Sequence, residues 1–487
     1  MADSRRAAER HIDNFQQLVF IQTKAIYFLL SIIVAFILTY LISNEDYTQV
    51  QNYVLFALLL AIGLWVTEAI PPFAVGIFIV GFLIFLVGAT ESNTPESANY
   101  LDVRKLTSTW SNSVIWLLLG GFFLAEALKK TGLDKKMFNY TVKLFGTKPK
   151  NLLFGIMLAT ALASMIMSNT AITAMMIASI LPLINVLGKD APFSKALLIG
   201  IPASASLGGM GTLIGSPPNI IAADAINNLI ENTEYTFRVG FLEWMMFGFP
   251  VAIILVIGFW VYLQRRFTAK VKVLDLSVVT IPENTGEENL VESFQRKITL
   301  GVLSVTILLW LTSSLNHIPP AVVSAIPIVV LTMFSIVNSD DVRKLPWDTL
   351  MLVAGGLSLG LAIQQSGLTK HFVILFSEVN VQGWVLISIF SLATVLFSNF
   401  MSNTATVTIL IPIASIIAIN TPVIMTIIIG LSASCALLFP VSTPPNAIAF
   451  GTGFLKQSDF RIGGLFAGIA GPLFVILWVY AVFYMLS

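Results

Sequence analysis

Apolar segments long enough to cross a lipid bilayer run through most of this sequence, and they limit its fold more than any other feature. A membrane-spanning helix needs about 20 predominantly apolar residues. Of the 487 residues, 56% are hydrophobic and only 11% are charged, whereas soluble domains carry about 25% charged residues. The sequence therefore predicts an all-α polytopic membrane protein. About eleven segments qualify as transmembrane helices: residues 25–42, 53–70, 72–87, 114–128, 197–221, 241–262, 298–315, 321–337, 350–363, 421–451 and 463–484.

Two further apolar blocks, residues 152–187 and 385–419, are too long for one crossing, and each carries Ser-Asn-Thr near its middle. Short loops rich in lysine and arginine stay in the cytoplasm. This rule places the basic N-terminus and the lysine-rich residues 129–150 inside. It keeps Lys189 and Lys195 inside only if the first block enters the membrane and returns. We therefore expect two re-entrant hairpins that enter from opposite faces, a cytoplasmic N-terminus and an external C-terminus.

Several motifs occur twice in the same order along the chain. Ser168-Asn169-Thr170-Ala171 recurs as Ser402-Asn403-Thr404-Ala405. The other pairs are Gly120-Gly121 with Gly355-Gly356, Ser216-Pro217-Pro218-Asn219 with Thr443-Pro444-Pro445-Asn446, and Ile70-Pro71-Pro72 with Ile318-Pro319-Pro320. The number of expected spans between the copies is odd, so the copies enter the membrane from opposite sides. Such inverted-topology repeats are a recurring plan of secondary transporters, which hold substrate near the midplane between broken helices.

The repeat also predicts the domain organisation. We expect an N-terminal tail and first span over residues 1–52, a first repeat over 53–265, a cytoplasmic linker over 266–297 and a second repeat over 298–487. Within the repeats we expect scaffold helices over 53–128 and 298–364, a transport hairpin and broken helix over 151–225 and over 384–451, a linking helix over 241–263 and a final helix over 463–485.

The repeated motifs indicate the chemistry of the site. A proline lacks an N–H and disfavours helix at the preceding residue, so each Pro-Pro pair stops a helix inside the membrane. The free N–H groups at a half-helix N-terminus suit anions, and unwound carbonyls suit small cations. Neither repeated motif contains lysine or arginine. We therefore predict one anion site, held by N–H groups, hydroxyls and amides, with a carbonyl-rich cation site on either side.

At these motifs the sequence resembles the divalent anion/sodium symporter family, which carries di- and tricarboxylates and sulfate. The resemblance covers essentially the chain from Tyr53 onward, and it rests on the paired Ser-Asn-Thr motifs, on residues 206–219 and on residues 439–447. It implies an elevator-type mechanism, a homodimer, location in the cell membrane, and Na+ as coupling ion with no other cofactor.

The resemblance also implies site residues. The substrate carboxylates would contact Ser168, Asn169, Thr170, Ser216, Ser402, Asn403, Thr404, Thr443 and Pro444. One sodium ion would be bound by Ser164, Ser168, Asn169 and Gly215, and a second by Ser398, Asn403 and Ser442. The function expected is Na+-coupled symport of C4/C5 dicarboxylates such as succinate, fumarate, malate and α-ketoglutarate. Sodium-independent dicarboxylate exchange, sulfate or citrate transport, and a channel stay open as alternatives.

Other classes of function find less support in the sequence. The 27 basic and 26 acidic residues nearly balance, so no surface for nucleic acid is expected. Ser358 lies in a Gly-Leu-Ser-Leu-Gly pattern that matches a hydrolase nucleophile elbow, but no strand precedes it and no histidine or aspartate partner is evident. We therefore do not expect an enzyme. The carboxylates Glu68 and Glu126 lie near the ends of predicted spans, where interfacial or capping roles are expected.

Overall fold

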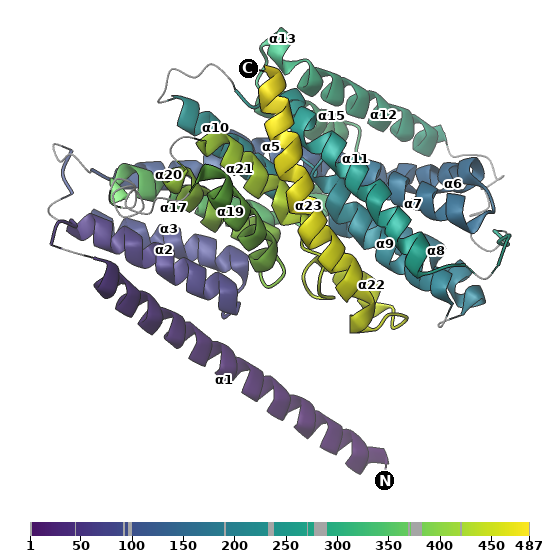
Figure 1. Cartoon of the computed structure of the whole chain (residues 1–487), viewed down its shortest axis with the longest axis horizontal. Coiled ribbons are helices and arrows are strands. Elements are labelled where there is room, and N and C mark those ends of the chain that lie inside the picture. Colours follow the sequence, from purple (N-terminus) through teal and green to yellow (C-terminus); the bar gives the residue numbers. More distant parts are fainter. Residues whose placement is uncertain are drawn as a thin grey trace. The chain divides into compact units, whose positions relative to one another are not determined.

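The structure of the protein is a computed structural model that describes residues 2–43, 45–90, 93–95, 100–188, 191–231, 238–269, 271–276, 290–368, 371, 382–418 and 421–486. Within these residues every regular element is a helix (Figure 1). Eight helices in this part of the chain are long and apolar enough to cross a membrane: Val19–Ile42, Gln49–Thr67, Val103–Lys130, Asn169–Leu187, Phe241–Arg266, Leu290–Leu311, Trp347–Gln365 and Gln457–Met485. The prediction of an all-helical chain with many membrane-length apolar helices is confirmed.

The chain divides into two compact units, of which the first comprises residues 1–110 and 351–376. Its helices are α1 (Ala2–Ile42), α2 (Gln49–Thr67), α3 (Pro72–Gly88), α4 (Val103–Ser108) and most of α17 (Trp347–Gln365). A capping box starts α2, because the Thr48 hydroxyl accepts from the Gln51 N–H while the Gln51 side chain accepts from the Thr48 N–H. These reciprocal bonds satisfy backbone donors that the first helical turn leaves unpaired.

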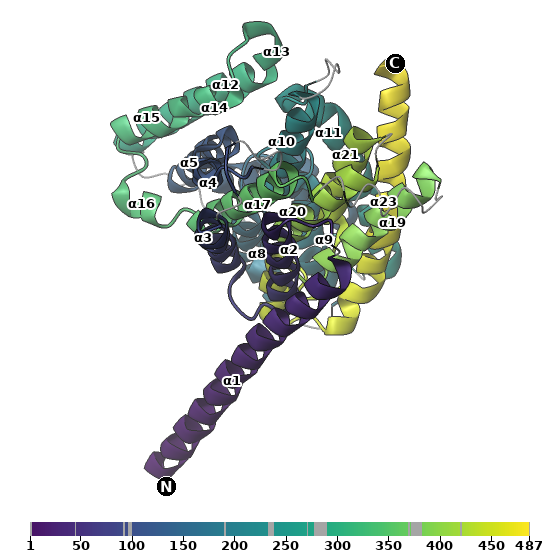
Figure 2. The ribbon, with the colours of Figure 1, turned by 90° about the vertical axis from the view of Figure 1, so that its left-hand side faces the viewer.

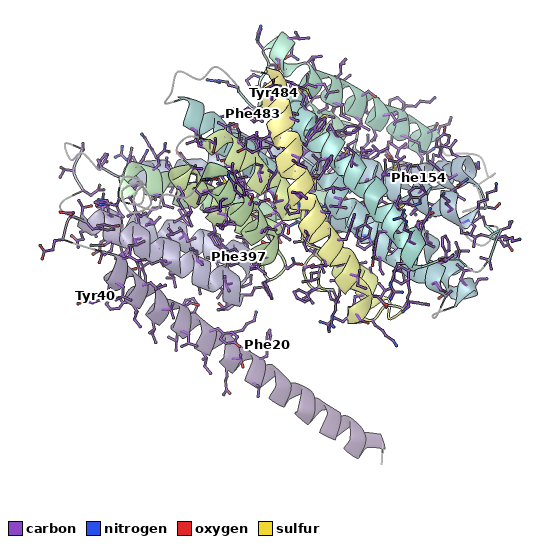
Figure 3. All side chains as sticks on the ribbon, in the orientation of Figure 1. Phe20, Tyr40, Phe154, Phe397, Phe483 and Tyr484 are labelled. Atoms are coloured by element: carbon purple, nitrogen blue, oxygen red, sulfur yellow. The ribbon has the colours of Figure 1, made fainter. Side chains whose placement is uncertain are left out.

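The membrane-length part of α1 exposes most of its apolar surface. Phe20 and Tyr40 are 61% and 77% exposed, and Figure 3 shows them extending from the ribbon. Only 11% of the most apolar stretch of this helix is buried. Because a contiguous exposed apolar surface marks contact with a membrane or a partner, the exposure fits a helix that faces lipid.

The second unit comprises residues 111–350 and 377–487. Its helices are α5 (Ser113–Lys130), α6 (Leu133–Phe145), α7 (Pro149–Ser164), α8 (Asn169–Leu187), α9 (Pro192–Gly209), α10 (Pro217–Glu231), α11 (Phe241–Arg266), α12 (Leu290–Leu311), α13 (Ser313–Asn316), α14 (Pro320–Val323), α15 (Ala325–Met333), α16 (Ser339–Arg343), α19 (Gly383–Ser398), α20 (Asn403–Ile417), α21 (Pro422–Ser432), η2 (Ala433–Cys435), α22 (Pro444–Gly451) and α23 (Gln457–Leu486). A further short helix, η1 (Thr109–Ser111), lies where the two units meet in sequence.

The helices of the second unit pack in several neighbouring pairs. α7 and α9 pack closely, α11 lies along both α9 and α23 (Figure 1), and α12 runs beside α15 (Figure 2). Trp244, Phe247 and Phe259 on α11 are at most 1% exposed. In a helix that crosses the membrane, such side chains stabilise packing through van der Waals contact with neighbouring helices rather than through removal from water.

The repeated Ile-Pro-Pro motifs start equivalent helices. Pro72 is the first residue of α3 and Pro320 the first residue of α14, positions where the missing N–H of proline costs no helical hydrogen bond. In both copies a tryptophan closes the turn, since Trp65 donates to the Pro72 carbonyl at 3.1 Å and Trp310 to the Pro320 carbonyl at 3.0 Å. The sequence repeat is therefore also a repeat of local structure.

The repeated glycine pairs pack against the helices that these prolines start, and they do so across the repeats. In the first unit Gly355 of α17 lies against the backbone of Gly76 in α3. In the second unit Gly120 of α5 lies against Ser324 at the end of α14, where an added Cβ would be 2.5 Å from the Ser324 Cβ. Each compact unit therefore combines elements of both sequence repeats.

Candidate functional site

Both Ser-Asn-Thr motifs start the returning helix of a helical hairpin. The Ser168 hydroxyl caps α8 by accepting from the Ala171 N–H at 3.1 Å, and the Ser402 hydroxyl caps α20 by accepting from the Ala405 N–H, also at 3.1 Å. The two caps share a φ of −63°. A helix start carries unpaired N–H groups and a partial positive charge, which together suit an anionic ligand such as a carboxylate.

The Pro-Pro-Asn motifs end two unwound linkers, one between α9 and α10 and one between η2 and α22. In the first linker the Asn219 amide donates to the carbonyls of Gly209 and Thr212 at 2.8 and 2.6 Å. In the second the Asn446 amide donates to the Phe439 carbonyl at 3.0 Å. Each asparagine thus ties the start of the second half-helix to the carbonyls of its own linker. Neither residue was among the predicted site residues, although its position in the repeated motif was the available signal.

The elements that carry the motifs pack crosswise between the repeats. α8 of the first hairpin packs against α22 of the second broken helix, and α20 of the second hairpin packs against α10 of the first. α9 packs against both η2 and α22. All of these elements belong to the second unit. The fold therefore joins each Ser-Asn-Thr helix to the Pro-Pro-Asn helix of the other copy.

The Asn169 amide lies in a cradle of oxygen atoms. The tip of the side chain faces Ser164 Oγ at 2.5 Å and the carbonyl oxygens of Ala205 and Gly215 at 3.2 Å. Because all three can accept a hydrogen bond, we orient the NH₂ group toward them. The Ser164 hydroxyl in turn donates to the Ala205 carbonyl at 2.8 Å. If the amide turns over, its oxygen completes a set of four oxygen ligands, which is the donor set of a small hard cation.

Two glycines make this cradle sterically feasible. A Cβ on Gly209 would lie 2.6 Å from Asn169 Oδ1, and a Cβ on Gly215 would overlap the Gly209 carbonyl oxygen. The clash at Gly215 is with backbone, so this position requires glycine for close backbone approach, whereas a Cβ at Gly209 would displace the Asn169 side chain. The structure thus brings Ser164, Asn169 and Gly215 of the predicted first sodium site together. It uses the hydroxyl of the fourth residue, Ser168, as a helix cap.

The corresponding oxygens of the second copy lack partners. Ser398 Oγ and Asn403 Oδ1 are buried and have no hydrogen-bond partner among the described residues. The third predicted residue, Ser442, donates from its hydroxyl to the Phe439 carbonyl at 2.8 Å and lies 3.4 Å from the Asn446 amide nitrogen. A buried oxygen without a partner costs about 1–3 kcal/mol, and a bound cation would remove that cost.

The residues predicted to contact substrate differ in burial. Thr443 caps α22 by accepting from the Asn446 N–H at 3.3 Å. Thr170 and Pro444 are exposed, Ser168, Asn169, Ser402 and Asn403 are half-buried, and Ser216, Thr404 and Thr443 are buried. Every hydrogen-bond partner found here for these residues is a hydroxyl, an amide or a backbone group. The described site therefore offers polar groups to an anion without a lysine or arginine contact.

Comparison with known proteins identifies the family. The citrate transporter family (CitMHS) matches residues 62–423, which is most of the chain. The chain belongs to this family. The resemblance seen at the repeated motifs is thereby confirmed, and so is the prediction of a membrane transporter rather than an enzyme.

Similar proteins agree with this assignment. The chain is 28% identical to a sodium-dependent dicarboxylate transporter of Staphylococcus saprophyticus, over 91% of this chain and 89% of that protein. It is 29% identical to a sodium-dependent dicarboxylate transporter of Staphylococcus aureus strain USA300, over 92% and 89%. The match extends over nearly the full length of both relatives.

Solved transporter structures share the fold at low sequence identity. The Alcanivorax borkumensis YdaH transporter superposes with a TM-score of 0.56 at 14% identity, over 84% of this chain and 98% of that one. The Neisseria gonorrhoeae MtrF efflux pump gives a TM-score of 0.54 at 13% identity, over 84% and 95%. At such identities the similarity concerns the fold alone, and it carries no information on substrate.

The residues weighed for other functions have structural roles. Ser358 is buried within α17, where its hydroxyl lies 2.6 Å from Thr109 Oγ1 and donates to the Leu106 carbonyl at 2.9 Å. Glu126 lies 3.5 Å from the Lys129 ammonium one turn later in α5. Glu68 ends α2 in the left-handed region, at a φ of 48°. Ser358 therefore links α17 to neighbouring segments, Glu126 forms an ion pair within α5, and Glu68 ends α2.

Proposed function

We propose that this transporter carries C4/C5 dicarboxylates across the cell membrane in symport with sodium. The observation that supports this most directly is the pair of oxygen sites at the hairpin tips, one closed around Asn169 and one with unpartnered oxygens at Ser398 and Asn403. Two relatives that align over nearly their full length are named sodium-dependent dicarboxylate transporters, which is consistent with both the ion and the substrate.

The charge balance explains why sodium would be required. A dicarboxylate brings two negative charges, and the described site offers no basic side chain to offset them. Moving uncompensated charge through the bilayer centre is costly, and two sodium ions reduce that cost by neutralising the substrate. Asn169 and Asn403 belong to both the predicted substrate set and the predicted sodium sets. Sodium binding would therefore fix the same amides that receive the carboxylates, which couples the two binding events.

The movement that we propose is an elevator. The two re-entrant hairpins and the two broken helices (151–225 and 384–451) would move together against scaffold helices (53–128 and 298–364) within a homodimer. The crosswise packing of α8 on α22 and of α20 on α10 supports joint movement, because neither hairpin can shift without the broken helix of the other repeat. About eleven crossings, a cytoplasmic N-terminus and an external C-terminus belong to the same proposal.

Uptake into proteoliposomes tests the proposed function. Labelled succinate should accumulate when sodium is present outside at higher concentration than inside, and it should not accumulate when potassium replaces sodium. Flux that requires internal dicarboxylate and ignores sodium would replace symport by exchange. The absence of any succinate flux under all of these conditions would refute dicarboxylate transport.

Citrate is the second candidate substrate, because the family carries the description of a citrate transporter. Competition separates the candidates. Unlabelled succinate, fumarate, malate and α-ketoglutarate should inhibit labelled succinate uptake more strongly than citrate or sulfate at equal concentration. Stronger inhibition by citrate would make the tricarboxylate the preferred substrate.

A further inference from the structure

Buried serine hydroxyls outside the two predicted sodium sites also lack partners. Ser204 is 0% exposed, and Ser206 and Ser434 are 1% exposed. The Oγ atoms of all three have no hydrogen-bond partner among the described residues. A helical serine ordinarily donates to the carbonyl four residues earlier, as Ser179 and Ser388 do here. The three unpartnered hydroxyls therefore need a separate explanation.

Helical spacing separates the two serines of α9. Ser204 lies four residues before Gly208, where an added Cβ would be 2.5 Å from the backbone of Ala161 in α7. Ser206 lies three residues before Gly209, which faces Asn169 at the start of α8. Residues three and four apart share a helix face. Ser204 is therefore directed toward α7, whereas Ser206 is directed toward the hairpin tip.

The second copy places Ser434 in the equivalent position. Its neighbours face other helices, since the Ser432 hydroxyl lies 2.8 Å from Ser391 Oγ in α19, and Cys435 lies against Gly471 in α23. Ser434 lies between Ser432 and Cys435 in the sequence, on the short helix η2. α9 and α20 also pack against η2. Because α9 belongs to the first repeat and η2 to the second, η2 lies at a junction of the two repeats.

We propose that Ser206 and Ser434 bind one further monovalent cation at the junction of the two repeats. This proposal rests on the proposed sodium-coupled function and adds a cation site to it. Both serines lie near the C-terminal end of a half-helix, α9 or α21 with η2. The C-terminal end of a half-helix carries a partial negative charge that favours cations.

The chemistry of the site favours sodium over a divalent ion. Calcium and other divalent cations are usually bound by carboxylates, and no cluster of His, Cys, Asp or Glu that could hold a metal occurs among the described residues. The ligands offered are hydroxyl oxygens with nearby backbone carbonyls of the unwound linkers. Such a set supplies oxygen without fixed charge, which suits an ion that must bind and leave in each cycle.

The ratio of sodium to succinate taken up tests this site. Uptake of ²²Na⁺ and of labelled succinate would be measured in parallel for the wild type, Ser206→Ala, Ser434→Ala and the control Ser204→Ala. The control removes an equally buried and equally unpartnered hydroxyl from the same helix, on the face toward α7. We expect the ratio to fall by one sodium ion per succinate in Ser206→Ala and Ser434→Ala, and to keep the wild-type value in Ser204→Ala.

Two results would overturn the additional site: an unchanged ratio in both junction variants, or an equal fall in the control. If a junction variant does not transport, the sodium-dependent rise in melting temperature of the purified protein without substrate replaces the flux. A smaller rise than in the wild type and the control supports the site, and an equal rise contradicts it. Wild-type uptake that ignores sodium would refute the proposed function itself, which is a different outcome from a sodium-dependent wild type with unchanged variants.

Discussion

The two hairpin tips hold their broken helices by different means. In the first copy the Thr212 hydroxyl of the linker donates to the Met165 carbonyl at the hairpin tip, at 2.5 Å. In the second copy the bond runs from the linker backbone to the tip, since the Leu438 N–H donates to the Asn399 side chain at 2.8 Å. The bond between linker and hairpin tip therefore uses a linker side chain in the first repeat and a hairpin side chain in the second.

The two copies also differ in how fully their oxygens are paired. Four glycines, Gly208, Gly209, Gly211 and Gly215, let the first linker approach the hairpin closely, and the Asn169 amide finds hydrogen-bond acceptors there. The second linker, residues 436–443, has no glycine, and the oxygens of Ser398 and Asn403 have no partner among the described residues. Two repeats with nearly equal motifs thus give one site in which protein groups pair the amide and one in which buried oxygens have no partner among the described residues.

The largest expected effect tests whether both copies are needed. Asn169→Ala and Asn403→Ala each remove an amide that we place at both carboxylate and cation. Interactions with charged groups contribute about 1.5–3 kcal/mol, so each variant should lower sodium-dependent succinate uptake by roughly 10-fold to 150-fold. Size-exclusion chromatography of the purified variants checks that they remain folded. Near-normal uptake in both variants would refute the assignment of the site.

The next effect concerns the close contact between Gly209 and Asn169, for which the second copy has no equivalent glycine in its linker. Gly209→Ala places a Cβ 2.6 Å from Asn169 Oδ1. Overpacking of this kind costs about 1–3 kcal/mol, so the sodium concentration for half-maximal uptake should rise several-fold. Gly451→Ala at the end of α22 is the matched control, because nothing lies within 4 Å of its added Cβ. Equal behaviour of the two variants would show that the cradle tolerates a side chain.

A smaller effect is expected when the linker asparagines are compared. The Asn219 amide makes two bonds of 2.8 and 2.6 Å, whereas the two carbonyl contacts of Asn446 are 3.0 and 3.4 Å. Asn219→Ala should therefore lower the thermal stability of the purified protein more than Asn446→Ala does. Losing such bonds costs about 1 kcal/mol each. A reversed order of melting temperatures would contradict the comparison of the two linkers.

The smallest effect concerns an ion pair outside the two hairpin tips, which serves as a reference for them. Asp341 forms an ion pair with Lys130 at 2.6 Å. Burial by itself raises the pKa of the Asp341 carboxyl, but the hydrogen bonds from Lys130 and from the Asn338 N–H outweigh it and hold the pKa below its usual range. The ionised carboxyl therefore stabilises the fold above its unfolded pKa of about 4, and this contribution is lost as the pH falls through the lowered folded pKa.

Asp341→Asn should consequently reduce stability at neutral pH by about 1 kcal/mol or less, and the difference from the wild type should shrink as the pH falls. Melting temperatures between neutral pH and pH 3 measure this dependence. The sodium dependence of succinate uptake should stay unchanged in this variant. A difference that grows toward low pH would contradict the sign of the pKa shift.

Much of the fold was predictable because it depends on local composition. The bilayer length requirement identifies apolar helices directly, and Pro72 and Pro320 start equivalent helices because proline fits the first turn. Part of the candidate site was predictable for the same reason, as the capping roles of Ser168 and Ser402 follow from serine placed before a helix. The roles of Asn219, Asn399 and Thr212 were not foreseen, since each depends on a carbonyl or N–H that an unwound linker presents only after folding.

The sequence by itself determined the helical character, the repeat and the residue types at the tips, because hydrophobic length, proline and capping act within a few residues. The tertiary structure decided which helices of the two repeats pack against each other. Nothing in the spacing of the motifs specifies that α8 packs on α22 and α20 on α10. Those choices follow from the close packing of helices far apart in the chain, which leaves some buried oxygens paired and others without a partner.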